Sequence, residues 1–127
     1  MPTLKEIMSQ DVLTTAADAS VAEVAEAMLK ARVGSIVVMD GTYLVGMFTE
    51  RDVVRAAASG SDLTSSPVSE WMTPDPVTAA QDAEAEEAAE IMMTQGFRHL
   101  PVVEGKDLLG IVSLRDILRT RIHRRGS

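Results

Sequence analysis

The chain has 127 residues, a net charge of −7 and an apolar content of 46%. This length fits one compact module or two very small domains, and the apolar content is sufficient for a buried core. The acidic balance argues against a nucleic-acid partner, because duplex binders normally present a basic face. The sequence contains no cysteine, no signal-peptide pattern and no apolar run near the ~18 residues of a membrane span. We therefore expect a cytoplasmic protein without a membrane partner.

The first half of the sequence predicts an element order of β-α-β-β-α. A capping box, Ser20 with Glu23, opens a helix whose apolar residues recur at helical spacing as far as Leu29. Asp40-Gly41 is a hairpin turn signal between two β-branched or apolar runs. In chain order, the predicted elements are an extended segment at 12–14, a helix beginning at 21, strands at 35–39 and 43–48, and a helix ending at 58.

The second half repeats the first at a constant offset of 64 residues, without a gap from Met8 to Arg55. It predicts an extended segment at 77–78, a helix at 83–95, strands at 99–103 and 108–112, and a helix at 113–122. We assign residues 1–60 and 68–127 to the two repeats, with a small polar linker at 61–67. Neither repeat is large enough to bury its own sheet and helix faces. We therefore expect an α+β fold in which the two sheets pack about a pseudo-two-fold axis, with clefts for small molecules between the repeats.

A Gly-apolar-apolar-Thr/Ser-x-x-Asp motif stands at the junction of a predicted strand and helix in each repeat, at residues 46–52 and 110–116. A fixed carboxylate can accept hydrogen bonds from both hydroxyls of a ribose, and a helix N-terminus suits phosphate. The same spacing is also that of a capping box, which stabilises a helix without any ligand. The motif alone leaves both interpretations open.

The paired motifs resemble those of the CBS-domain family, named for cystathionine β-synthase, in its tandem arrangement. The resemblance is carried by Ile7, Met8 and Thr14 and by residues 38–41, 44–52, 71–73, 99–105 and 109–116. It implies a stand-alone, non-catalytic module that senses AMP, ADP, ATP or another adenosyl compound, requires no cofactor, and regulates an unidentified protein. It also implies a disc-like homodimer formed through exposed apolar helix faces at Val53, Val54, Ala57, Ile117 and Leu118. The competing hypothesis is a ligand-free dimerisation or scaffold module.

By this resemblance, Asp52 and Asp116 are the ribose-binding residues, and Thr49 and Ser113 are the matching hydroxyls. The expected phosphate-binding cations are Arg98, His99, Arg115 and Arg51. The expected base pocket contains Leu13, Thr14, Ile36, Val77, Thr78, Pro101 and Ile111. Each assignment has a simpler alternative: an arginine can pair with an acid one helical turn away, His99 can be an ordinary strand-end residue, and the apolar residues can be core.

The sequence carries no pattern typical of catalysis. It lacks the phosphate loop, HExxH and GxSxG motifs, and the presence of only two histidines and no cysteine argues against a transition-metal centre. We therefore expect neither catalytic nor metal-ligating residues. The acidic run between Asp82 and Glu90 fits a solvated helix start, and the basic tail at 119–125 fits either a frayed helix end or a contact with an acidic partner.

Overall fold

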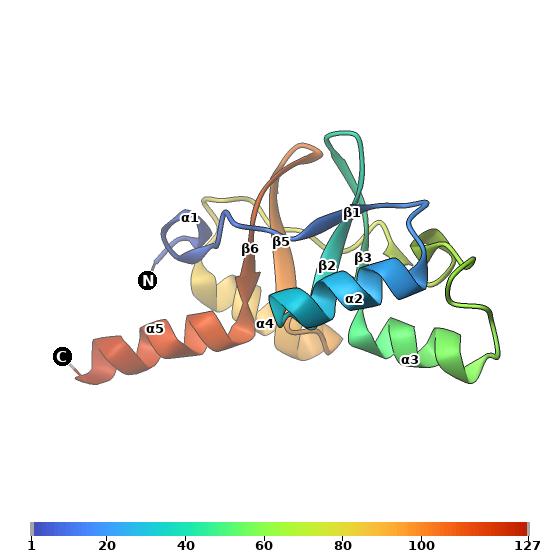
Figure 1. Ribbon diagram of the computed structural model, residues 1–127. Coiled ribbons are helices and arrows are strands. Elements are labelled where there is room, and N and C mark those ends of the chain that lie inside the picture. The colour runs from blue at the N-terminus through green and yellow to red at the C-terminus, as the bar shows by residue number, and fades with distance from the viewer. Residues whose placement is uncertain (1, 127) are drawn as a thin grey trace. The chain divides into compact units, whose positions relative to one another are not determined.

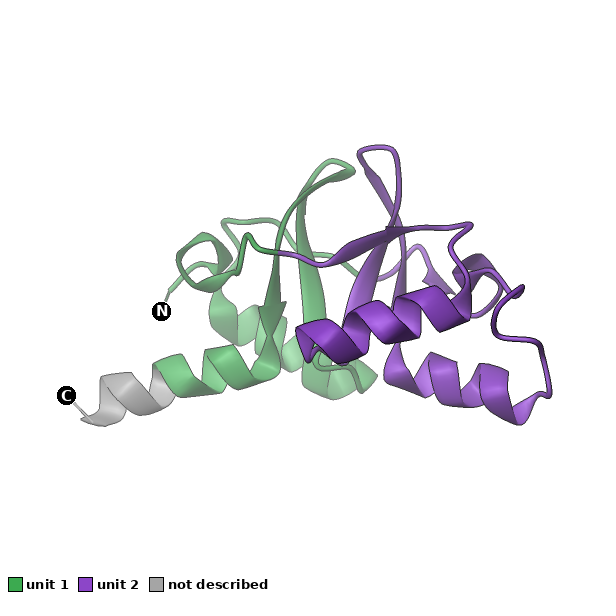
Figure 2. Cartoon of the chain, in the orientation of Figure 1, with its two compact units in different colours: residues 1–11, 77–127 green, residues 12–76 purple. Residues whose placement is uncertain are grey.

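A computed structural model describes the backbone of residues 2–126 and the side chains of residues 2–120 (Figure 1). The chain forms two compact units (Figure 2). One unit consists of residues 12–76, and the other combines residues 1–11 with residues 77–127. The mixed helix and strand content agrees with the predicted α+β class.

The unit of residues 12–76 is built on a four-stranded mixed sheet. Strand β1 pairs in parallel with β2, β2 pairs antiparallel with β3, and β3 pairs antiparallel with β4. The first helix begins where Ser20 accepts a hydrogen bond from the Glu23 N–H, as the capping box predicts. The elements are β1 (Thr14–Ala16), α2 (Val21–Ala31), β2 (Ser35–Asp40), β3 (Tyr43–Thr49), α3 (Glu50–Ala58), the 3-10 helix η1 (Val68–Glu70) and β4 (Thr73–Pro74).

The second unit repeats the hairpin and its two helices. Strands β5 and β6 are antiparallel, and the two-residue turn between Glu104 and Asp107 places Gly105 at a φ of 63°. Both hairpins shift register at equivalent places, after Val38 and after Val102. The elements are α1 (Leu4–Ile7), α4 (Ala85–Gln95), β5 (His99–Glu104), β6 (Asp107–Ser113) and α5 (Leu114–Gly126).

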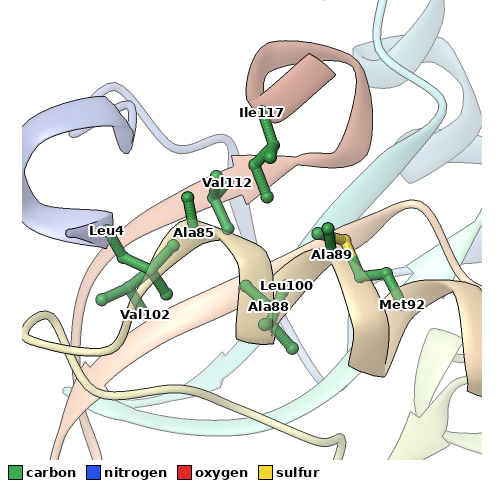
Figure 3. Close-up of a cluster of buried hydrophobic side chains, with 9 residues drawn as sticks. All are labelled: Leu4, Ala85, Ala88, Ala89, Met92, Leu100, Val102, Val112 and Ile117. Atoms are coloured by element: carbon green, nitrogen blue, oxygen red, sulfur yellow. The ribbon is translucent and has the colours of Figure 1, made fainter. Parts of the chain in front are cut away.

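Each unit has its own apolar core. In the unit of residues 12–76, helices α2 and α3, η1 and one sheet face contribute to a cluster that includes the fully buried Phe48. In the other unit, small residues of α4 let that helix lie close to the hairpin and to Leu4 (Figure 3). This second cluster consists of Leu4, Ala85, Ala88, Ala89, Met92, Leu100, Val102, Val112 and Ile117.

The compact units do not coincide with the sequence repeats. The N-terminal segment belongs with the second repeat: Leu4 donates to the Ala83 carbonyl at 2.9 Å, and Ser9 exchanges two backbone hydrogen bonds with Ile111. Correspondingly, residues 68–74 belong with the first repeat, where Val68 donates to the Ala19 carbonyl at 2.8 Å. The linker expected at 61–67 is also bonded to α2 through backbone hydrogen bonds, so it is part of the unit of residues 12–76.

The glycine of each repeated motif has a packing role. A Cβ at Gly110 would approach the backbone oxygen of Ser9 to 2.7 Å, and a Cβ at Gly46 would collide with the sulfur of Met72. Gly110 thus allows Met8 and Ser9 to lie directly against β6, and Gly46 allows Met72 and Thr73 to lie directly against β3. The motif glycines are therefore explained without a ligand.

Two expectations about apolar helix residues were wrong. Leu29, which continues the apolar spacing of α2, is 80% exposed, because Val21, Val24 and Met28 alone face the core. Ile117, expected on an exposed face, is 1% exposed, because it lies on the side of α5 that faces the hairpin core. Of the other face residues, Val54, Ala57 and Leu118 are exposed, and Val53 is half-buried.

The tail side chains at 121–125 lie outside the described residues. Within the described chain, no helix has the length and apolar character needed to cross a membrane.

Candidate ligand-binding site

In the first repeat, the side chain of Asp52 is fully engaged at the start of α3. One carboxylate oxygen, Oδ2, accepts from the Thr49 N–H at 2.9 Å and from the Thr49 hydroxyl at 3.3 Å. The other oxygen, Oδ1, accepts from Arg55 at 3.0 Å. The Asp52 N–H donates to the Thr49 hydroxyl oxygen in return, which completes the capping box. Asp52 is only 6% exposed, so both oxygens serve the fold.

In the second repeat, the same motif is only half closed. The Asp116 N–H donates to the Ser113 hydroxyl oxygen at 3.0 Å, so Ser113 caps α5. No hydrogen bond or ion pair reaches the Asp116 carboxylate from the side chains of residues 2–120 or from their backbone. Asp116 is half-buried, which leaves its carboxylate available to an external donor.

The start of β5 brings cations to this junction. His99 pairs with Ser113 across the β5–β6 ladder, and the Arg98 carbonyl accepts from the Leu114 N–H at 2.9 Å. Burial lowers the pKa of His99 below its ordinary value; Asp116 raises the pKa, and Arg115 and Arg98 lower it. The His99–Ser113 pairing and the hydrogen bond from Leu114 to Arg98 bring the backbone of Arg98 and the first turn of α5, with Arg115 and Asp116, to the residue that carries the imidazole. The structure thus brings together five of the predicted site residues in one unit.

The equivalent positions of the first repeat lack the cations of the second and add an acid. Gly34 and Ser35 stand where the second repeat has Arg98 and His99, and Glu50 stands where it has Leu114. The Glu50 N–H donates to the Gly34 carbonyl at 3.0 Å, and a Cβ on Gly34 would meet the Glu50 carboxylate at 3.0 Å. Ser35 is buried. This junction therefore has one acid more and two potential cations fewer than the junction of the second repeat.

The residues expected around the base have mixed surroundings. Ile36 is 1% exposed and belongs to the apolar core, and Leu13 is half-buried against the same core. Pro101 is buried, and its carbonyl accepts from the Ala79 N–H. Thr14 and Val77 are exposed, and Thr78 and Ile111 are half-buried. The accessible members of the expected pocket in the second repeat are therefore Val77, Thr78 and Ile111.

One arrangement was missed at the sequence level. The Arg55 guanidinium, which pairs with Asp52, also lies 5.7 Å from the centroid of the Trp71 ring. This contact ties α3 to the segment that follows η1. The Asp52-to-Arg55 spacing signalled the ion pair, but no local pattern signalled Trp71.

Arg51, expected to bind phosphate, is exposed on α3, and Arg115 is exposed on α5. Among the described residues, no group of three His, Asp or Glu side chains is arranged to hold a metal.

Comparison with known proteins identifies the family. A family model described as the CBS domain matches residues 4–59 and 68–123. The chain belongs to the CBS-domain family. The two matches together make it a tandem CBS pair, as the sequence motifs indicated.

Relatives of similar length support this assignment. The chain is 40% identical over 118 residues to a 17.7 kDa protein of Acidianus ambivalens, covering 91% of this chain and 71% of the relative. It is 35% identical to the CBS domain-containing protein YhcV of Bacillus subtilis, covering 92% of this chain and 84% of the relative. An inosine-5'-monophosphate dehydrogenase of Methanocaldococcus jannaschii is 37% identical, but this CBS pair covers only 23% of that enzyme.

Solved structures share the fold of this CBS pair. A CBS-domain protein of Agrobacterium tumefaciens superposes with a TM-score of 0.85 at 33% identity, covering 94% of this chain and 98% of that chain. The CBS domain pair of protein MJ0100, in complex with 5'-methylthioadenosine and S-adenosyl-L-methionine, superposes with a TM-score of 0.88 at 26% identity. The superposition covers 98% of each chain.

Proposed function

We propose that this CBS pair is a non-catalytic regulatory module that binds an adenosyl ligand, and that its second repeat holds the ligand. The observation that carries the proposal is the contrast between two equivalent carboxylates. Asp52 accepts three hydrogen bonds within its own repeat, whereas Asp116 accepts none from the described residues. A carboxylate without a partner at a helix start is suited to the vicinal hydroxyls of a ribose.

The cations around Asp116 define the rest of the ligand. Arg98 and Arg115 offer guanidinium groups to phosphate oxygens, and His99 adds a third donor. The N-terminus of α5 contributes a positive dipole end on the same side. AMP, ADP and ATP combine a ribose with phosphate, so they match both the Asp116 carboxylate and the cations around it. The MJ0100 structure, which contains two adenosyl compounds, supports the adenosyl class.

The role of Ser113 is narrower than the sequence suggested. Its hydroxyl oxygen already caps α5 by accepting from Asp116. Its remaining function toward a ligand is to donate its own hydrogen, since a hydroxyl has one donor in addition to its lone pairs. Thr49 has no such freedom, because its hydroxyl both accepts from and donates to Asp52.

Regulation follows if the ligand prefers one shape of the module over another. A ligand shifts such an equilibrium only by the difference between its affinities for the two shapes. An unidentified protein partner would then respond to the shape that the ligand favours.

Calorimetric titration of AMP, ATP, S-adenosylmethionine and methylthioadenosine into the full chain tests this proposal. We expect at least one of them to bind, and Asp116→Asn to weaken its binding by at least tenfold. Asp107→Asn is a matched control, because it removes an exposed carboxylate at the far end of β6, the strand that leads into α5. Retained binding in Asp116→Asn, or no binding of any of the four ligands to the unmodified chain, would refute the proposal.

A dimerisation or scaffold role is the second candidate, and one observation favours it. Leu29 and Met93 are 80% and 63% exposed, and Val54 and Leu118 are 66% and 44% exposed. Each pair occupies equivalent positions of the two repeats, so both repeats present apolar residues at the same positions. Sedimentation of the unmodified chain and of a Val54→Lys, Leu118→Lys variant tests this role. A homodimer that the double substitution dissociates would support it, and a monomer at all concentrations would exclude it.

A further inference from the structure

The second repeat places a titratable side chain among the groups that are suited to a nucleotide. Resting on the function proposed above, we infer that nucleotide binding at the second repeat is coupled to uptake of a proton by His99. The site would then respond to the nucleotide and to pH together.

The position of His99 is fixed by the hairpin and not by a flexible loop. It is the first residue of β5 and pairs with Ser113, the last residue of β6, immediately before α5. Ser113 in turn caps the Asp116 N–H. The imidazole is half-buried, so its surroundings determine how readily it carries a charge.

Three charged groups influence the imidazole. Arg98 directly precedes β5 in the chain, and Arg115 and Asp116 lie on the first turn of α5. Burial and the two arginines disfavour the protonated form, and Asp116 favours it. In the free protein, His99 is therefore biased toward the neutral form near neutral pH.

A bound phosphate changes this balance. It brings negative charge to Arg98 and Arg115, so their repulsion of a protonated imidazole is offset. A protonated His99 can also donate a hydrogen bond to a phosphate oxygen from either ring nitrogen. The proton is taken from solvent, and no covalent bond forms or breaks.

The sign of the pH dependence follows directly. The nucleotide favours protonated His99, so its affinity is highest at low pH and decreases as pH rises through the titration of the bound form. The first repeat has Ser35 at the equivalent position, so it contains no group that could act in this way. Adenosine, which lacks the phosphate, should bind with little dependence on pH.

Calorimetric titration of AMP and adenosine over about pH 5.5 to 8.5 tests the inference, because a histidine titrates within this range. In the unmodified chain we expect AMP affinity to decrease by up to about tenfold per pH unit between the free and bound titrations of His99. In His99→Gln we expect AMP affinity to change with pH only because the phosphate of AMP itself titrates near pH 6. Repeating the titration in buffers of different ionisation enthalpy measures proton uptake directly and requires no variant.

The outcomes separate the two proposals. If AMP binds both proteins with parallel pH profiles, or binds the unmodified chain without proton uptake, the coupling is wrong and the adenosyl site stands. If Asp116→Asn retains AMP affinity while the pH dependence is lost in His99→Gln, the coupling stands and the ribose assignment is wrong. If AMP does not bind the unmodified chain at any pH, the coupling is wrong, and the adenosyl site stands only if S-adenosylmethionine or methylthioadenosine binds.

Discussion

The Asp52 carboxylate and the Arg55 guanidinium form an ion pair at 3.0 Å on the first turns of α3. The equivalent residues of the second repeat, Asp116 and Arg119, have the same spacing and form no ion pair, although the structure describes both side chains. The two copies of one motif therefore differ in their contacts. In the first copy the carboxylate caps a helix and forms an ion pair, and in the second it makes neither contact with the side chains that the structure describes.

Asp52→Ala should destabilise the protein by about 1–2 kcal/mol, because it removes the side-chain half of the capping box and leaves the half-buried Thr49 N–H without its acceptor. Asp116→Ala should cost less than about 0.5 kcal/mol, because the Ser113 cap remains. Urea unfolding of the two variants without ligand measures the difference. Equal losses of stability would contradict the assignment of different roles.

Arg32→Gly should stabilise the protein by roughly 0.5–1 kcal/mol. Arg32 ends α2 with a φ of 58°, a left-handed conformation that a side chain disfavours. At the equivalent position α4 ends with Gly96, at a φ of 80°. Thermal unfolding of Arg32→Gly and of the reciprocal Gly96→Arg tests this, and the reciprocal variant should be destabilised. A loss of stability in Arg32→Gly would show that its side chain has a stabilising role.

The order of helix, hairpin and second helix in each repeat was predictable because it depends on local signals, whereas α1, η1 and β4 were not predicted and the extended segment expected at 77–78 forms no strand. Capping residues, alternation and the Asp40-Gly41 turn define α2, β2 and β3 over nearly the residues observed. The pairing of Ser9 with Ile111 was not predictable, because it joins segments about a hundred residues apart. The Asp52 carboxylate accepts hydrogen bonds and the Asp116 carboxylate accepts none from the described residues. This difference depends on side-chain conformation, which the identical residue spacing of the two motifs does not predict. The change from Gly34 and Ser35 to Arg98 and His99 was the visible sign that the repeats differ.

Gly110→Ala should destabilise the protein by roughly 1–3 kcal/mol, because the new methyl group would meet the Ser9 backbone. The effect should be local to the contact with residues 3–9. Hydrogen exchange of the Ile111 and Ser9 amides, which bond each other's carbonyls, measures it. Gly105→Ala serves as a control for backbone strain without a steric contact, since nothing lies near its Cβ. Unchanged protection of Ser9 in Gly110→Ala would contradict this account of the motif glycine.

His99 should also make folding stability depend on pH. Its pKa in the folded protein is lowered, mainly by burial, so the unfolded chain binds a proton more readily. Its contribution to stability is therefore present above the unfolded value of about 6.5 and is lost as pH decreases through the folded value. Compared with His99→Gln, the ligand-free protein should lose additional stability between about pH 7 and 5. Parallel stability profiles of the two proteins would show that His99 titrates as it does in the unfolded chain.

The number of nucleotides bound per chain is the most direct test of the division of roles between the repeats. Native mass spectrometry of the chain with AMP should show one nucleotide per chain, which Asp116→Asn removes and Asp52→Asn retains in the folded fraction. Two nucleotides per chain, or a single one that is lost in Asp52→Asn and retained in Asp116→Asn, would contradict the account.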